Sequence, residues 1–403
     1  MTQLTQHQPS ERKLLGVAGL AWLFDAMDVG MLSFIIAALA ADWKLNEVQM
    51  GWIGSISSIG MAVGAFIFGL TADRIGRKNV LILTLLIFSI SAGLSALATG
   101  LTLFLILRFI IGMGLGGELP VASTLVSESV ATERRGRIVV LLESFWAGGW
   151  IIAALISYFI IPPFGWRVAL LIGALPAFYA IYLRWNIHDS ANYVAKSLKE
   201  KPSVLQNIIT IWSKKYVRQT VMLWVLWFCV VFSYYGMFLW LPGVVALKGF
   251  SMVKSFGYVL IMTIAQLPGY FTAAWLIEKW GRKWVLVVYL LGTAVFAYFF
   301  GYATSLAVLL TSGILLSFFN LGAWGALYAY SPEQYPAVVR GTGTGMAAAF
   351  GRIGGIFGPL LVGYLLAQKV SIGSIFTIFC ISIIVAILAV LFLGRETKNK
   401  VLS

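Results

Sequence analysis

Twelve apolar stretches, each long enough to cross a lipid bilayer, follow one another along this sequence. A helix needs about 20 apolar residues to span the hydrocarbon core of a bilayer, and a backbone in lipid must satisfy its own hydrogen bonds. The stretches fall at residues 14–41, 48–71, 79–99, 102–126, 138–161, 166–184, 219–245, 254–277, 284–303, 306–329, 342–367 and 371–394. We therefore predict an all-α integral membrane protein with twelve transmembrane helices.

The composition agrees with this interpretation. Hydrophobic residues make up 60% of the chain and charged residues only 11%, whereas soluble domains carry roughly 25% charged residues. Both cysteines, Cys229 and Cys380, fall in apolar stretches, and the two histidines, His7 and His188, fall in a tail and a predicted loop. These residues make no metal cluster, so we expect no metal and no cofactor. A proton carrier within the membrane must then be a carboxylate.

The net charge of +14 is distributed unevenly. Most of the 29 Lys and Arg residues lie in the two tails and in the loops after the second, fourth, sixth, eighth and tenth stretches. Cytoplasmic loops of membrane proteins are the ones enriched in Lys and Arg. We therefore predict that both termini are cytoplasmic, and we expect the basic residues to meet membrane lipids and not nucleic acid.

The chain divides into two halves of six helices each. We predict an N-terminal bundle at 1–184, a cytoplasmic linker with short amphipathic helices at 185–218, and a C-terminal bundle with a short tail at 219–403. The halves repeat each other, because Gly69–Lys78 after the second stretch matches Ala274–Lys283 after the eighth. Six-helix repeats place a substrate site between the halves, near the middle of the bilayer.

The repeated segments resemble signatures of the major facilitator superfamily, and in part those of its sugar-porter branch. The first signature contains Gly69, Asp73, Arg74, Gly76 and Arg77. The related acidic and basic positions elsewhere are Glu128, Arg135, Glu278, Arg282, Glu333 and Arg340. The resemblance implies a cytoplasmic gate in which these charges bias the equilibrium between two conformations.

Carboxylates and an arginine occur within the predicted spans. The first helix contains Asp25 and Asp28, and the fourth contains Arg108 and Glu118. A charged group in the bilayer costs roughly 2.5–3.5 kcal/mol and therefore marks a partner or a function. Asp28 and Arg108 resemble a pair in proton-coupled sugar porters, which implies a proton switch, and a permanent structural ion pair is the alternative. Asp25 and Glu118 are further candidates for proton coupling. We expect Glu143, near the start of the fifth helix, to be structural.

Aromatic residues cluster in the helices that would line a central site. The candidate substrate-binding residues are Trp146, Tyr234, Tyr235, Trp240, Trp324 and Tyr328, with Gln266, Asn320 and Arg352 as polar partners. Aromatic walls favour flat rings, and a guanidinium suits a carboxylate. A sugar would need more amides than Gln266 and Asn320 supply. The residues alone therefore predict a flat organic anion.

Over its whole length the chain most resembles the bacterial niacin transporters. It is also similar, near Tyr234–Pro242, to the synaptic-vesicle glycoprotein branch and, at Asp25 and Asp28, to aromatic-acid/proton symporters. The resemblance implies import of nicotinate or a similar aromatic acid with a proton, by a monomer in a bacterial plasma membrane and not by an enzyme. An exporter of drugs or metabolites, a sugar porter and a non-transporting nutrient sensor remain as alternatives.

Overall fold

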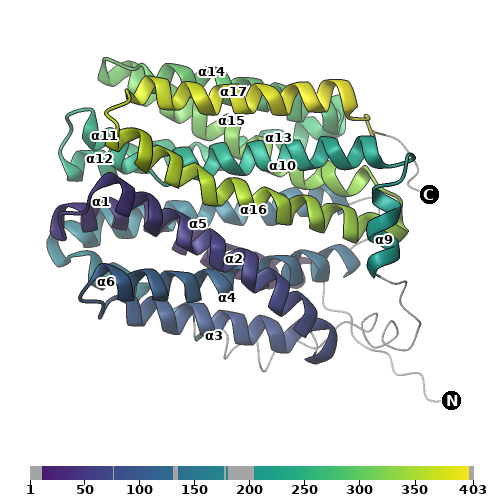
Figure 1. Cartoon of the computed structure of the whole chain (residues 1–403), viewed down its shortest axis with the longest axis horizontal. Coiled ribbons are helices and arrows are strands. Elements are labelled where there is room, and N and C mark those ends of the chain that lie inside the picture. Colours follow the sequence, from purple (N-terminus) through teal and green to yellow (C-terminus); the bar gives the residue numbers. More distant parts are fainter. Residues whose placement is uncertain (1–10, 76, 130–134, 177, 180–203, 399–403) are drawn as a thin grey trace.

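The computed structural model describes residues 11–75, 77–129, 135–176, 178–179 and 204–398. Within these ranges, the side chains of residues 11–14, 17, 69–75, 77–78, 81, 117–129, 135–137, 139, 204 and 337 are outside the description. The described backbone consists of helices joined by short connections, without a strand. The long helices run roughly parallel to one another in two adjoining groups (Figure 1). The predicted all-α class is confirmed.

The two groups correspond to the two halves of the sequence. The first group contains α1 (Glu11–Asp42), α2 (Glu47–Ile75), α3 (Arg77–Ser95), α4 (Leu101–Ser129), α5 (Arg135–Phe164) and α6 (Trp166–Ile172). The second contains α10 (Val217–Phe238), α11 (Leu241–Leu247), α12 (Met252–Ile264), α13 (Gln266–Trp280), α14 (Arg282–Gly301), α15 (Leu306–Glu333), α16 (Ala337–Ala367) and α17 (Ile372–Leu393). Between them, α9 (Val204–Ile211) lies in the predicted linker, of which residues 185–203 are outside the described part.

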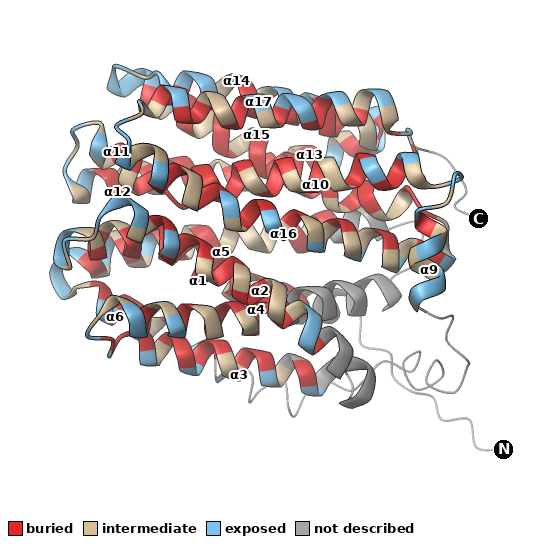
Figure 2. Cartoon of the chain, viewed as in Figure 1, coloured by how far each residue is buried: buried red, intermediate tan, exposed pale blue. Residues whose placement is uncertain are grey.

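Nine segments within the described residues are long and apolar enough to cross a bilayer. The predicted spans at 79–99, 102–126 and 166–184 each include residues or side chains outside the description. Large apolar side chains are exposed on the outer faces of the helices, among them Phe66, Phe178 and Phe392, which are 70–72% exposed. Figure 2 shows exposed residues along the outward sides of both groups and mostly buried residues where helices face one another. Such a surface suits lipid and not water.

Two of the predicted spans each consist of two helices. The stretch 219–245 forms α10 and α11, and the stretch 254–277 forms α12 and α13. Proline lacks the N–H that would bond to the carbonyl four residues earlier, and its ring crowds that carbonyl. Pro242 therefore disrupts the helix at Phe238, where α10 ends, and Pro268 disrupts it at Ile264, where α12 ends.

Equivalent helices pack alike in the two halves. In the first half α1 packs on α5 and α2 on α4, and the equivalent helices of the second half, α10 with α16 and α13 with α15, are also in contact. Glycines permit the close approach of α2 and α4. A Cβ atom at Gly112 would lie 2.2 Å from the carbonyl oxygen of Ser57, and one at Gly116 would lie 2.0 Å from that of Met61. The glycine-rich run in the fourth stretch is therefore a packing motif.

The two halves meet tightly at the end of the molecule where α1 ends and α2 begins. Phe34 of α1 packs edge to face on Phe256 of α12, with ring centroids 5.1 Å apart. The hydroxyl of Ser55 donates to the carbonyl of Ile356 at 2.6 Å, which joins α2 to α16. A Cβ atom at Gly363 would lie 2.4 Å from the carbonyl oxygen of Glu47. This end of the interface between the halves is closed.

Candidate functional site

A buried ion pair joins α1 to α4. The guanidinium of Arg108 donates to both carboxylate oxygens of Asp28, at 3.1 and 2.8 Å. The two side chains are only 1% and 2% exposed. The Nε of Arg108 also donates to the hydroxyl of Ser57 on α2, at 3.3 Å. A bidentate pair of this kind fixes the orientation of both groups. Movement of α1 against α4 would therefore distort or break this pair.

A small cavity lies between the two halves, lined almost entirely by aromatic side chains. Its free volume is about 20 Å³, which is room for about one water molecule, so a larger ligand requires the walls to move apart. The lining residues are Trp22, Glu143, Trp146, Tyr235, Tyr270, Trp324, Tyr328 and Arg352. They come from α1 and α5 in the first half and from α10, α13, α15 and α16 in the second. Asparagine and glutamine do not occur in this lining.

Contacts among the aromatic side chains hold the cavity wall together across the halves. The indole of Trp146 donates to the hydroxyl of Tyr234 at 2.8 Å. Trp324 and Tyr328 stack with centroids 5.9 Å apart and an interplanar angle of 27°. Tyr328 also makes an edge-to-face contact with Trp22, with ring centroids 6.1 Å apart. These rings form flat walls, and a planar ligand would fit between them by the same offset and edge contacts.

Arg352 is the cationic group of the cavity. It lies midway along α16, and its guanidinium donates to the hydroxyl of Tyr235 at 3.2 Å and approaches the Sδ of Met61 at 3.4 Å. The carboxylate of Asp25 on α1 is close enough to interact with it electrostatically. The single phenol and the thioether leave most of the five guanidinium N–H donors for another acceptor. The arrangement can therefore bind an anion inside the cavity.

Five of the nine predicted substrate-binding residues line the cavity, and four do not. Tyr234 packs behind the wall, and the indole of Trp240 donates to the carbonyl of Pro359 at 3.2 Å. Gln266 and Asn320 are buried outside the lining, and their side chains include polar atoms without hydrogen-bond partners among the described residues. A role in substrate binding for these four stays a prediction.

Three lining residues were not among the predicted binding residues: Trp22, Glu143 and Tyr270. The expectation that Glu143 is merely structural does not account for its place in the cavity wall. A signal for two of them was present in the sequence, because residues three or four apart share a helix face. Trp22 lies three residues before Asp25, and Glu143 lies three residues before Trp146.

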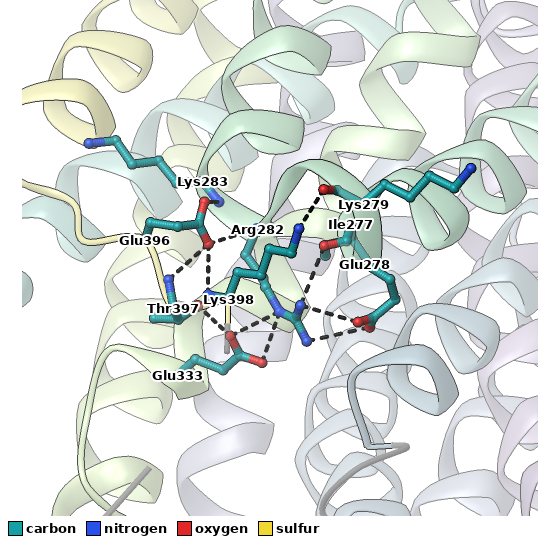
Figure 3. A network of polar contacts seen from close by, with 9 residues as sticks. All are labelled: Ile277, Glu278, Lys279, Arg282, Lys283, Glu333, Glu396, Thr397 and Lys398. Carbon is teal, nitrogen blue, oxygen red and sulfur yellow. Dashed lines mark hydrogen bonds and ion pairs between the residues drawn. The ribbon is translucent and has the colours of Figure 1, made fainter. Parts of the chain in front are cut away.

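A second cluster of charges lies in the C-terminal half, at the end opposite the closed one (Figure 3). Arg282 lies between two carboxylates, 3.4 Å from Glu278 and 3.1 Å from Glu333. Glu396 accepts hydrogen bonds from the backbone N–H groups of Arg282 and Lys283, at 3.0 and 3.1 Å, so it caps the start of α14. Thus the segment after α17 is tied to α14.

The other predicted gate residues are placed less completely. Thr397 donates to Glu333 and joins the C-terminal segment to α15. Arg340 donates to the carbonyl of Tyr335 at 3.3 Å. The described part of the chain excludes Gly76 and the environment of Gly69. It also excludes the side chains of Asp73, Arg74, Arg77, Glu128 and Arg135, and that of the proton-coupling candidate Glu118. Pairing of charges across the halves therefore stays a prediction, and the described pairs lie within the C-terminal half.

Comparison with known proteins identifies relatives over almost the whole chain. The sequence is 46% identical to the niacin transporter NiaP of Acinetobacter baylyi over 417 residues, covering 97% of this chain and 95% of the relative. It is 68% identical over 395 residues to a Bacillus subtilis protein provisionally named as the niacin/nicotinamide transporter NiaP, covering 98% of both chains. These relatives are bacterial membrane transporters by name, not enzymes, and the predicted kinship is confirmed.

Solved structures show the same twelve-helix fold. The inward-open xylose transporter XylE of E. coli superposes with a TM-score of 0.80 at 20% identity, covering 97% of this chain and 98% of XylE. A D-xylose–proton symporter gives a TM-score of 0.79 at the same identity. At this identity the likeness shows the fold alone. The family model described as Major Facilitator Superfamily matches residues 18–265 and 255–403. The chain is a multi-pass membrane transporter that belongs to the Major Facilitator Superfamily.

Proposed function

We propose that this transporter imports nicotinate, or a closely similar aromatic carboxylate, together with a proton. The observation that carries the proposal is the guanidinium of Arg352 within a cavity whose other walls are aromatic. A flat ring would lie against Trp324 and Tyr328, and its carboxylate would accept hydrogen bonds from Arg352. The names of the two niacin transporters to which the chain is 46% and 68% identical support the same substrate.

The cavity favours an aromatic acid over a sugar. Hydroxyl groups of a buried sugar need several donors and acceptors, because unpaired polar groups in a closed site are costly. The lining contains one carboxyl, one guanidinium, three tyrosine hydroxyls and three indole N–H groups, but only the carboxyl and the hydroxyls can accept a hydrogen bond, and it contains no amide. This set matches a ligand with one anionic group and a large apolar face.

Asp25 provides a physical route from substrate binding to proton binding. In the absence of substrate, the Asp25 carboxylate and the Arg352 guanidinium attract each other. A substrate carboxylate competes with Asp25 for that guanidinium, and the released Asp25 then binds the transported proton. Asp28, three residues further along α1 and paired with Arg108, transmits the change to α4. One proton accompanies one monoanion, so the cycle moves no net charge.

Alternating access in this chain would use the interface between the halves. The closed end described above is held by contacts of α1 and α2 with α12 and α16. The predicted topology puts this closed end at the outer surface. Opening it requires these contacts to separate while the ion pairs around Arg282 rearrange.

Uptake of radiolabelled nicotinate into proteoliposomes tests the proposal, with a pH gradient and a membrane potential imposed separately. We expect accumulation driven by the pH gradient alone, about tenfold per pH unit, and no accumulation with Asp25→Asn, which removes the proton-binding carboxylate, or with Asp28→Asn, which breaks its link to α4. Asp42→Asn is the matched control, because Asp42 is an exposed carboxylate at the end of the same helix. Binding without flux would favour a nutrient sensor, proton-driven efflux would favour an exporter, and uptake of a sugar instead would favour a sugar porter.

A further inference from the structure

Glu143 is a buried carboxyl group in the cavity wall that the proposed cycle leaves unused. It lies on α5, one turn before Trp146, and only 3% of the residue is exposed. Its Oε1 has no hydrogen-bond partner among the described residues. The indole N–H of Trp22 is directed at the carboxyl but lies beyond normal hydrogen-bond geometry, so this contact leaves Oε1 available to a ligand. Most buried polar side-chain atoms have partners, so an unpartnered carboxyl oxygen facing a cavity indicates a ligand.

Glu143 and Arg352 both line the same small cavity. Tyr328 lines the same cavity as both of them. They do not pair with each other, since the donors of Arg352 in the described structure reach Tyr235 and Met61. A ligand that fits the cavity therefore meets a cation at one position and a carboxyl group at another, with aromatic walls between them.

We propose that Glu143 binds the ring nitrogen of a pyridine carboxylate while Arg352 binds its carboxylate. This assignment rests on the proposed function, and it makes Glu143 the residue that determines specificity for the ring. One proton lies between the nitrogen and the Glu143 carboxyl. If the carboxyl carries the proton, it donates to the nitrogen, and if the ring carries the proton, the N–H donates to the carboxylate. No bond to the ring changes in either case.

The consequence is discrimination between a pyridine ring and a benzene ring of the same shape. Benzoate has the flat ring and the carboxylate of nicotinate, but a C–H group replaces the nitrogen. When benzoate binds, the Glu143 carboxyl stays buried without a partner, whereas nicotinate supplies one. Sites that hydrogen-bond a substrate reject analogues lacking that group, because their own polar atoms are left unpaired.

The test measures how well unlabelled nicotinate and benzoate inhibit uptake of labelled nicotinate in proteoliposomes. In the wild type we expect benzoate to inhibit at least tenfold more weakly than nicotinate, as the loss of one buried hydrogen bond to a charged group implies. Glu143→Leu should bring the two inhibition constants together, mainly by weakening nicotinate. Glu143→Gln should retain part of the preference, because its amide can still donate to the nitrogen. Ser144→Ala, next to Glu143 on α5, should leave the preference unchanged.

The possible outcomes separate this inference from the proposed function. If the wild type takes up nicotinate but benzoate competes equally well, the assignment of Glu143 is wrong and the proposed function stands, and this result needs no variant to fold. Equal weakening of both ligands by Glu143→Leu, in protein that remains monodisperse, would assign the residue a structural role and overturn the inference. If the wild type neither binds nor transports nicotinate, both proposals fail together.

Discussion

Removing one member of the Asp28–Arg108 pair should lower the free energy of unfolding, whereas replacing both members should leave it nearly unchanged. We consider Asp28→Leu, Arg108→Met and the double substitution. Asp28→Leu leaves the buried guanidinium with only the hydroxyl of Ser57 as a side-chain partner among the described residues. Arg cannot be neutralised within a protein, whereas an Asp carboxyl can be neutralised by binding a proton. We therefore expect Asp28→Leu to destabilise the protein more than Arg108→Met does.

The magnitude follows from the geometry of the pair. Its two hydrogen bonds measure 3.1 and 2.8 Å, and water is almost excluded from both side chains. Removing one member of such a buried pair costs about 3–5 kcal/mol, whereas replacing both by apolar groups of similar volume is often neutral or stabilising. We expect about 3–5 kcal/mol for Asp28→Leu and a double variant within about 2 kcal/mol of the wild type.

The assay is unfolding of the purified protein by SDS in mixed micelles, which yields a free energy of unfolding for each variant. The exposed pair of Asp42 and Arg167, 4.0 Å apart, provides a matched control cycle. Its coupling energy should be under about 1 kcal/mol, as is usual for exposed ion pairs. Additive losses in the Asp28 and Arg108 cycle, with a double variant as unstable as the sum of the single ones, would refute the reasoning.

Three further predictions follow from single positions. Arg352→Lys keeps the charge but loses the planar fork, so the apparent KM for nicotinate should rise roughly 10- to 100-fold in the uptake assay while expression is unchanged. Gly112→Ala should lower thermal stability by about 1–3 kcal/mol because its Cβ would meet the backbone of α2, whereas Gly345→Ala, with nothing within 4 Å, should be neutral or stabilising. Gly281→Ala should cost about 1–3 kcal/mol in the same thermal assay, since φ is 95° there and the new Cβ would lie 2.5 Å from the Glu396 carboxylate. Equal melting temperatures for Gly112→Ala and Gly345→Ala, or an unchanged KM for Arg352→Lys, would count against these arguments.

The helices, their number and their division into halves could be predicted because they depend on the length and polarity of local segments. An apolar stretch of sufficient length has no stable alternative to a helix in lipid. The glycine run at Gly112 and Gly116 could be interpreted in the same way, since glycines a turn apart on an apolar helix favour close packing. The prolines at 242 and 268 are signals for the helix breaks, but each apolar stretch is long enough to be interpreted as a single helix.

The composition of the cavity depended on the tertiary structure. Tyr234 and Tyr235 are neighbours in sequence, yet only Tyr235 lines the cavity and reaches Arg352, because successive residues on a helix point about 100° apart. Glu143 shows the same dependence. Its spacing from Trp146 was visible, but only the rotation of α5 against α1 and α15 turns both residues into one cavity. Local sequence determines where a helix forms, whereas which of its faces meets the substrate is decided by packing against helices that are distant in the chain.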